Sequence, residues 1–202
     1  MPRGRPRTFD RDAALEKAML VFWERGYEGV SMSDLTAAMD INSPSLYAAF
    51  GSKEALFREA VERYGERFEV RCAGRETARE AVEEWLLERS RTFADQAHPP
   101  GCMVVLSGLN CTARNTPIRE FLAQKRRAHL DALRVRLAQG VADGDIPENT
   151  DLDAMVRFFG TVLHGLAIQA LDGAREVDLR TVVDAAMAAW PRFTQEKGAA
   201  AP

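Results

Sequence analysis

The sequence predicts an all-α protein in two parts, a three-helix head followed by a six-helix body. Apolar residues recur with the 3.6-residue period of an amphipathic helix along almost the whole chain of 202 residues, and alternating strand patterns are nearly absent. Serine, aspartate, glycine and proline, which cap or end helices, stand where the periodic stretches begin and stop. The composition is 46% hydrophobic and 28% charged, as expected of a globular protein with a sizeable core.

The first predicted helix covers about residues 10–25. Asp10 can cap its amino end, and Leu15, Met19 and Phe22 form one apolar stripe at helical spacing. Gly26 is expected to end the helix because glycine adopts the backbone conformation that follows a helix carboxyl end.

Two short helices are predicted next, joined by a three-residue turn. The segment Ser31-Met-Ser-Asp34 has the Ser-x-x-acid pattern of a capping box and starts the first of them. Asp40-Ile-Asn42 interrupts the helical pattern. The second short helix is expected to begin with Ser43 as its N-cap and Pro44 at the first helical position, where a missing amide hydrogen costs nothing.

Six longer helices make up the predicted body. They are expected at about residues 54–71, 76–95, 102–112, 117–139, 151–172 and 178–194. The chain is therefore divided into a head, residues 1–52, with an amino-terminal arm and the two short helices, and an all-helical body, residues 53–202. The helix that starts near residue 54 links the two parts.

Several other classes of protein are disfavoured. No signal peptide is visible, and the most apolar stretch, residues 158–171, is interrupted by His164 and Gln169, so no membrane span is expected. The three cysteines form no CxxC pair, and no metal or cofactor site is indicated. The missing signal peptide and the separated cysteines favour a cytoplasmic protein. Phosphate-binding loops, metal-binding histidine pairs and nucleophile motifs are also missing, so we do not expect an enzyme.

The two short helices at 31–50 fit a helix-turn-helix that reads DNA. In that motif the first helix crosses the DNA backbone and the second presents its first side chains to base edges in the major groove. Ser43 and Ser45 are small enough for close approach and can bond to bases or phosphate. Small helical domains also fold in this way without binding DNA, so the spacing alone leaves both interpretations open.

The residues themselves resemble the DNA-binding signature of the tetracycline-repressor (TetR) family. The resemblance covers about residues 8–60 and is carried by Gly26-Tyr27, Ser31, Leu35, Ala38-Met39, Ile41, Ser45-Leu46-Tyr47, Phe50 and Lys53-Glu54-x-Leu56-Phe57. It implies a repressor that binds a palindromic operator as a dimer and is released by a small molecule. Body sequences diverge widely in this family, so the resemblance does not name the ligand.

Applied position by position, the resemblance implies a set of DNA contacts. It places contacts with the DNA backbone at Ser31 and Ser33. Base-facing positions are Ser43, Pro44, Ser45 and Ala48, and Tyr47 and Lys53 are expected to contact phosphate. Three positions depart from the family pattern. Asp40 and Pro44 stand where glycine is common, and Ala49 replaces a histidine or tyrosine that would contact phosphate.

The amino-terminal arm is a second expected DNA contact. Arg3, Arg5 and Arg7 precede the first acidic residue, and a flexible arginine-rich arm fits a narrow A·T-rich minor groove. A merely solvated tail is equally compatible with this composition. Residues 1–60 hold eight Lys/Arg against nine Asp/Glu, so the head is not basic and dimerisation is expected to supply most of the useful binding.

The body is expected to form a homodimer through its last two helices. The helix at 151–172 is apolar around most of its circumference, which predicts burial against its own core on one side and a partner on the other. The predicted interface residues are Phe159, Val162, Leu163, Leu166, Ala170, Val182, Ala186 and Trp190. A deeply buried helix of a monomer is the alternative. A two-fold dimer would require a palindromic operator.

A small apolar effector is expected inside the body. Residues that could line an apolar cavity with a few polar anchors are Trp85, Phe93, Met103, Leu106, Asn110, Phe121, His129, Phe159 and His164. Each also fits an ordinary core position. Cys102 and Cys111 raise a second hypothesis, thiol sensing, but nine residues of helix separate them by roughly 13 Å, too far for a disulfide.

The main alternative function is an all-helical adaptor that binds other proteins and has no sequence-specific DNA binding. An adaptor explains the apolar helix at 151–172 equally well. It gives no reason for the pattern of residues from Ser43 to Lys53, which therefore favours the DNA-binding interpretation.

Overall fold

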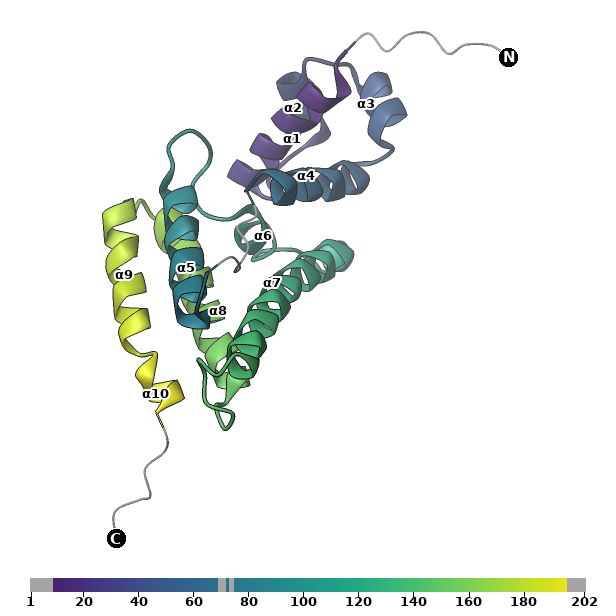
Figure 1. Ribbon diagram of the computed structural model, residues 1–202. Coiled ribbons are helices and arrows are strands. Elements are labelled where there is room, and N and C mark those ends of the chain that lie inside the picture. The colour runs from purple at the N-terminus through teal and green to yellow at the C-terminus, as the bar shows by residue number, and fades with distance from the viewer. Residues whose placement is uncertain (1–8, 69–71, 73–74, 196–202) are drawn as a thin grey trace.

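The computed structural model describes residues 9–68, 72 and 75–195, and within these ranges the chain is all-α. Figure 1 shows the head at one end of the molecule and the body below it. The helices are α1 (Arg11–Arg25), α2 (Met32–Met39), α3 (Ser43–Phe50), α4 (Lys53–Phe68), α5 (Ala78–Ala94), α6 (Met103–Leu106), the 3₁₀ helix η1 (Ala113–Asn115), α7 (Thr116–Ala142), α8 (Leu152–Leu171), α9 (Glu176–Ala188) and α10 (Pro191–Thr194). The predicted fold class is confirmed.

The helix ends in the head follow the predicted capping residues, with one exception. The Asp10 side chain accepts hydrogen bonds from two backbone amides of α1, and Ser31 and Asp34 form the complete capping box of α2. The prediction that Ser43 caps α3 was wrong. Asn42 is the N-cap, and its Oδ1 accepts from the Ser45 amide at 2.9 Å, because its extended backbone lets the side chain fold back over the first turn.

A compact apolar core holds the three head helices against α4. The side chains of Phe22, Leu35, Leu46 and Phe57 are fully buried. The rings of Phe22 and Phe57 meet edge to face with their centroids 5.0 Å apart, so α1 and α4 are firmly packed together. α3 packs against α2 and α4.

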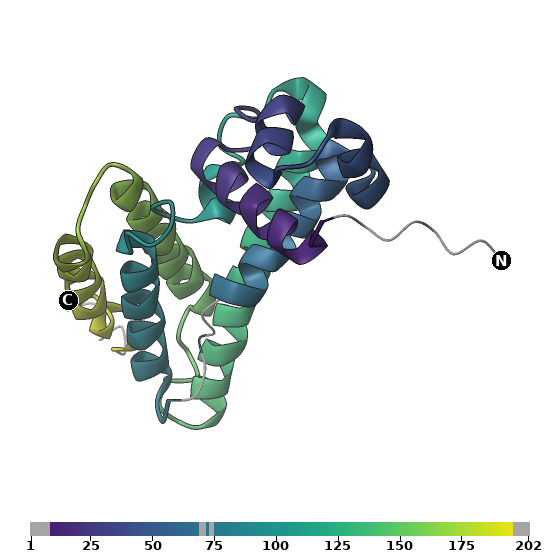
Figure 2. The ribbon, with the colours of Figure 1, turned by 90° about the horizontal axis from the view of Figure 1, so that it is seen from above.

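In the body, α8 is the central helix. It packs against α5, α6, α7 and α9, and Figure 2 shows α5 and α9 on one side of it and α7 on the other. Gly160 permits the close approach of α7, since a Cβ at this position would lie 2.5 Å from Leu130 Cδ2. Gly165, one turn later on α8, faces open space instead.

Two predicted helices are shorter or divided. The helix expected at 102–112 ends at Leu106, and the chain then turns towards α1 of the head, where the Ser107 hydroxyl reaches the Phe22 carbonyl at 3.4 Å. The last predicted helix divides into α9 and α10 before Pro191, which has no amide hydrogen to continue the helix. In both places a contact or a proline overrides the local helical pattern.

One described helix, α8, meets the length and composition criteria for a membrane span, although no span was expected. α8 has 20 residues, and an 18-residue window within it has a mean hydropathy of 1.4, so the helix is long and apolar enough to cross a membrane. Core helices of compact proteins meet the same two criteria, and α8 packs against four other helices.

Candidate nucleic-acid interface

α3 presents one exposed face at the outer end of the head (Figure 1). Leu46 and Phe50 point inward and are buried, which leaves the rest of this two-turn helix on the surface. The exposed residues are Ser43, Pro44, Tyr47 and Ala48, and Ser45 is partly buried. The structure therefore brings the predicted base-facing positions together on one free helix face.

Tyr47 and Lys53 lie on either side of the turn between α3 and α4. The Tyr47 side chain is 50% exposed, a large fraction for an aromatic residue, so its hydroxyl is free to meet a phosphate. Lys53 starts α4, and its Nζ lies 4.2 Å from the centroid of the Tyr27 ring. Burial lowers the pKa of Lys53, while Glu28 and Asp34 act in the opposite direction. Tyr27 thus fixes the position of the lysine, a role that we did not predict.

The two residues at the start of α2 that are predicted to contact the DNA backbone, Ser31 and Ser33, differ in whether their hydroxyls are available. Ser33 is exposed. The Ser31 hydroxyl is occupied by the capping box, since it accepts from the Asp34 amide at 3.1 Å and donates to the Asp34 carboxylate. The hydrogen bonds that the Ser31 hydroxyl and the Ser31 amide donate to this carboxylate lower the pKa of Asp34. Arg3, Arg5 and Arg7 lie outside the described residues, so their contact with DNA stays a prediction.

Asp40 explains why glycine is common at its position in the family pattern. It ends α2 with φ 55° and ψ 47°, the left-handed conformation that glycine adopts without strain. Its carboxylate is exposed in the turn before α3, where negative charge opposes phosphate.

We therefore expect Asp40→Gly to stabilise the head by about 0.5–1 kcal/mol and to strengthen DNA binding, because it removes both backbone strain and charge. Asp40→Asn keeps a side chain that tolerates this conformation and should strengthen DNA binding with little change in stability. Urea unfolding and fluorescence anisotropy measure the two effects separately. Weaker DNA binding by both variants would contradict this interpretation.

The predicted ligand-binding residues do not gather at one site. Trp85, Phe93, Met103 and Phe159 are buried core residues. Leu106 and Asn110 line a small cavity of about 190 Å³ between the head and the body, together with Trp23, Gly26 and Ser107 among others. Phe121 packs beneath the guanidinium of Arg58, whose Cζ lies 4.5 Å from the ring centroid.

His129 and His164 are close enough to influence one another inside the body. Burial lowers the pKa of His129 to about 4, with smaller contributions from Arg89, His164 and Lys125, and burial also lowers the pKa of His164. Both imidazoles are therefore neutral at pH 7.

This shift predicts how stability depends on pH. An unfolded histidine binds a proton near pH 6.5 whereas His129 in the fold does so near pH 4, so stability is complete above pH 6.5 and falls between these values. We expect the loss due to His129 between pH 7 and 5 to be about 1–2 kcal/mol after its partial exposure is considered. Urea unfolding at the two pH values should show a smaller loss for His129→Gln than for the wild type. An equal loss of stability in the two proteins would show that His129 is not the source of this pH dependence.

Most of the predicted dimer residues are buried within one subunit. Six of them belong to its own core: Phe159, Leu163, Leu166, Ala170, Ala186 and Trp190. Val162 and Val182 are partly buried. The apolar side chains that these helices expose are instead Ile168, Leu171 and Val177, which are 41%, 50% and 55% exposed. Six of the eight predicted interface positions therefore face the core of their own subunit.

Glu28 connects the head to the body. Its Oε1 accepts hydrogen bonds from the Thr112 amide, the Thr112 hydroxyl and Asn115 Nδ2, each at 2.8 Å. These bonds, that of Asn115 first, lower the pKa of Glu28. In a second contact between head and body, the Trp23 ring of α1 stacks on His98 with centroids 4.4 Å apart. Head and body therefore meet through specific contacts from α1 and the turn after it.

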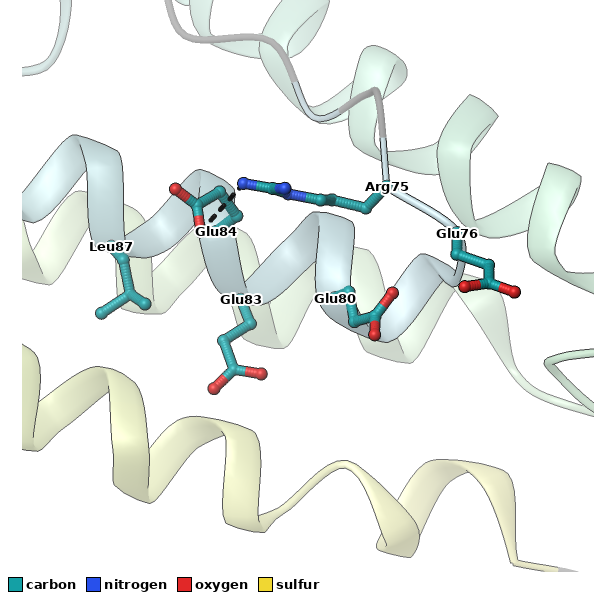
Figure 3. A pocket seen from close by; sticks show the side chains of 6 residues that line it. All are labelled: Arg75, Glu76, Glu80, Glu83, Glu84 and Leu87. Atoms are coloured by element: carbon teal, nitrogen blue, oxygen red, sulfur yellow. Dashed lines mark ion pairs between the residues drawn. The ribbon is translucent and has the colours of Figure 1, made fainter.

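A further hollow of about 570 Å³ lies along α5, far from α3. Figure 3 shows that its charged residues are mainly acidic, with Arg75 paired to Glu84 at 3.4 Å. The lining residues are Arg75, Glu76, Glu80, Glu83, Glu84 and Leu87. Its charge is unsuited to phosphate, so it is not part of the nucleic-acid interface.

The described part of the chain holds no group of three potential metal ligands. Cys102 is buried and Cys111 is partly buried, and both are free thiols. Burial, with Glu28 next, raises the pKa of Cys111, so this thiol is protonated and weakly nucleophilic at neutral pH.

Comparison with known proteins gives one consistent family. The model of bacterial regulatory proteins of the tetR family matches residues 14–60, and the model of the tetracyclin repressor-like C-terminal domain matches residues 74–181. The chain is 31% identical over 198 residues to the HTH-type transcriptional repressor ComR of Escherichia coli K12, covering 96% of this chain and 94% of ComR.

Solved structures agree in fold and in sequence. A cysteine mutant of the TetR family transcriptional regulator CifR, complexed with a 26 bp double-strand operator DNA, superposes with a TM-score of 0.88. It is 46% identical, and the match covers 93% of this chain and 100% of that one. A putative TetR transcriptional regulator from Rhodococcus sp. RHA1 is 38% identical with a TM-score of 0.59, over 87% and 96% of the two chains.

These matches extend over both the head and the body and agree with the exposed face of α3. The protein is a DNA-binding transcriptional regulator and not an enzyme, and it belongs to the tetR family of bacterial regulatory proteins.

Proposed function

We propose that the protein is a repressor that binds a palindromic operator as a dimer and leaves it when a small molecule binds the body. The observation that carries this proposal is the free face of α3, with Ser43, Pro44, Tyr47 and Ala48 exposed together. A two-turn helix with small residues at its amino end fits the major groove. An adaptor has no need of this face, and family membership removes the support for that alternative.

The same helix face suggests how the roles divide. Ser43, Pro44, Ser45 and Ala48 would face base edges and specify sequence, while Tyr47 and Lys53 would contact phosphate and set affinity. The arginine arm would add contacts in the adjacent minor groove. Since the head holds more acidic than basic residues, a single head binds weakly and two heads are needed.

A second copy of the chain is the proposed partner of α8 and α9. Ile168 and Leu171 on α8 and Val177 on α9 expose apolar side chains, and Gly165 on the same helix leaves open space beside it. Burying this face against its equal would form a two-fold dimer, which presents two α3 helices to successive turns of the major groove.

Release by an effector requires that the body and the head be coupled. The contacts of Glu28 with Thr112 and Asn115, and of Ser107 with Phe22, join the segment after α6 directly to α1 and its following turn. A small molecule that binds the body better when this segment is displaced would favour the released state by its differential affinity. We also propose that the DNA-binding head ends at residue 52, where the body begins. The protein would act in the cytoplasm, where it has access to DNA.

The experiment is selection of bound duplexes from a randomised pool by the purified full chain, followed by anisotropy titrations. We expect an enriched palindrome and binding that weakens steeply with salt, because phosphate contacts release counterions. Thermal-shift screening of small organic molecules, with displacement of the selected duplex as readout, tests the effector. Failure to enrich any duplex would contradict the proposal, whereas failure to find a ligand would contradict only release by an effector.

A further inference from the structure

Arg11, the first residue of α1, makes three contacts with two other helices of the head, α3 and α4. Its Nη2 donates to Glu59 Oε2 of α4 at 2.6 Å and to the backbone carbonyl of Ala49 in α3 at 3.3 Å. Its guanidinium carbon also lies 4.3 Å from the centroid of the Phe50 ring. The side chain is 28% exposed, so these contacts are partly shielded from solvent.

The contact with Ala49 matters because α3 is weakly held. Only two of its eight side chains, Leu46 and Phe50, are buried. The last carbonyls of a helix have no partner within the helix, and its carboxyl end carries partial negative charge. A guanidinium at this end satisfies one carbonyl and complements the helix dipole. Arg11 therefore supplies a polar bridge from α1 and α4 to the last turn of α3.

We propose that Arg11 is a positioning residue for operator binding, which with Glu59 fixes the orientation of α3 and does not itself contact DNA. The inference rests on the proposed function, since it assumes that α3 reads the operator. The side-chain geometry supports it, because one nitrogen of the fork serves both Glu59 and Ala49 while the guanidinium plane covers Phe50. A lysine ammonium could donate to the same two acceptors, but it has no planar guanidinium to lie over the Phe50 ring.

A direct phosphate contact by Arg11 is the competing interpretation, and Glu59 separates the two by the sign of its effect. If Arg11 touched phosphate, Glu59→Gln would remove a nearby negative charge and release the arginine, so DNA binding would strengthen. If Arg11 positions α3, the same change loosens the bridge and DNA binding weakens. A phosphate contact also contributes about one to the slope of log affinity against log salt, whereas a positioning residue contributes nothing.

The test uses the full-length dimer and the duplex that the wild-type chain selects from a randomised pool. We expect Arg11→Met and Glu59→Gln each to weaken binding about tenfold, the usual scale for a charge-assisted hydrogen bond, with an unchanged salt slope. The double variant should lose little more than either single one, because both act through one bridge. Arg11→Lys should fall between wild type and Arg11→Met.

Arg67→Met is the matched control. Arg67 pairs with Glu16, so this change also removes an ion pair between α1 and α4, but that pair does not touch α3. It should leave the affinity for the duplex within about twofold of wild type, and circular dichroism should show that every variant is folded.

Tighter binding by Glu59→Gln, a salt slope reduced by Arg11→Met, or additive losses in the double variant would overturn the inference. None of these results affects the proposed function, which is tested separately by whether the wild-type chain selects a duplex and binds it as a dimer. If Arg11→Met does not fold, Glu59→Gln and Arg11→Lys decide between positioning and phosphate contact by the same criteria.

Discussion

Lys53→Ala should weaken operator binding across all sequences and reduce the dependence of affinity on salt. Lys53 begins α4, and its ammonium is fixed above the Tyr27 ring beside the exposed face of α3. A lysine that neutralises one phosphate contributes about 0.9 to the slope of log affinity against log salt, so the dimer should lose about two. We expect a loss of affinity of about tenfold per head near 0.1 M salt.

Tyr47→Phe provides a contrast with the lysine variant. The phenol is 50% exposed, so loss of its hydroxyl costs the fold little and removes one neutral hydrogen bond to phosphate. Affinity should fall on every sequence while the salt slope stays unchanged.

Lys17→Ala, at an exposed lysine of α1, is the control that tests whether Lys53→Ala acts only through a general loss of positive charge. If that control lowers affinity and salt slope as much as Lys53→Ala does, a specific phosphate contact at Lys53 is excluded.

Breaking the proposed dimer should have the largest effect of all. Asp in place of both Ile168 and Leu171 puts charge on a face that is exposed in one subunit and would be buried between two. The subunit should remain folded, because neither side chain belongs to its core. Operator affinity should fall about a hundredfold or more, since the second head is no longer held near its half-site.

Val135→Asp is the control for the dimer variant. Val135 is 70% exposed on α7, so this change adds one aspartate, half the charge of the double variant, to an exposed apolar position on another helix. Analytical ultracentrifugation should show a dimer for the wild type and for Val135→Asp, and a monomer for the double variant. A monomeric wild type, or a dimer that only Val135→Asp disrupts, would be incompatible with an α8–α9 interface.

The sequence allowed the head to be predicted well because its helix ends are decided locally. The caps at Asp10 and Ser31 depend on residues within one turn. The residue pattern from Leu46 to Lys53 additionally indicates the protein family. Ser43 was assigned as the cap of α3 because serine before proline is a good local pattern. Asn42, one residue earlier, satisfies the same amide, and capping preferences alone do not separate these neighbours.

The body was harder to predict because its details depend on contacts distant in sequence. The helix at 102–112 ends after four residues, where Ser107 and Thr112 bond to the head, and periodicity does not reveal such bonds. Apolar residues occur around most of the circumference of α8. The sequence pattern therefore does not distinguish the side of this helix that faces the core from the side that is exposed. Arg11 was missed because an arginine in a first helical turn is usually solvated.

The central claim is that two α3 helices of one dimer bind one palindromic operator. The most direct measurement is the stoichiometry and half-site spacing of the duplex selected from a randomised pool, by ultracentrifugation and footprinting on that duplex. We predict one or more whole dimers on each duplex and half-sites centred about 10 base pairs, one helical turn, or a multiple of it, apart. A selected duplex without two-fold symmetry, bound by a single subunit, would contradict this account.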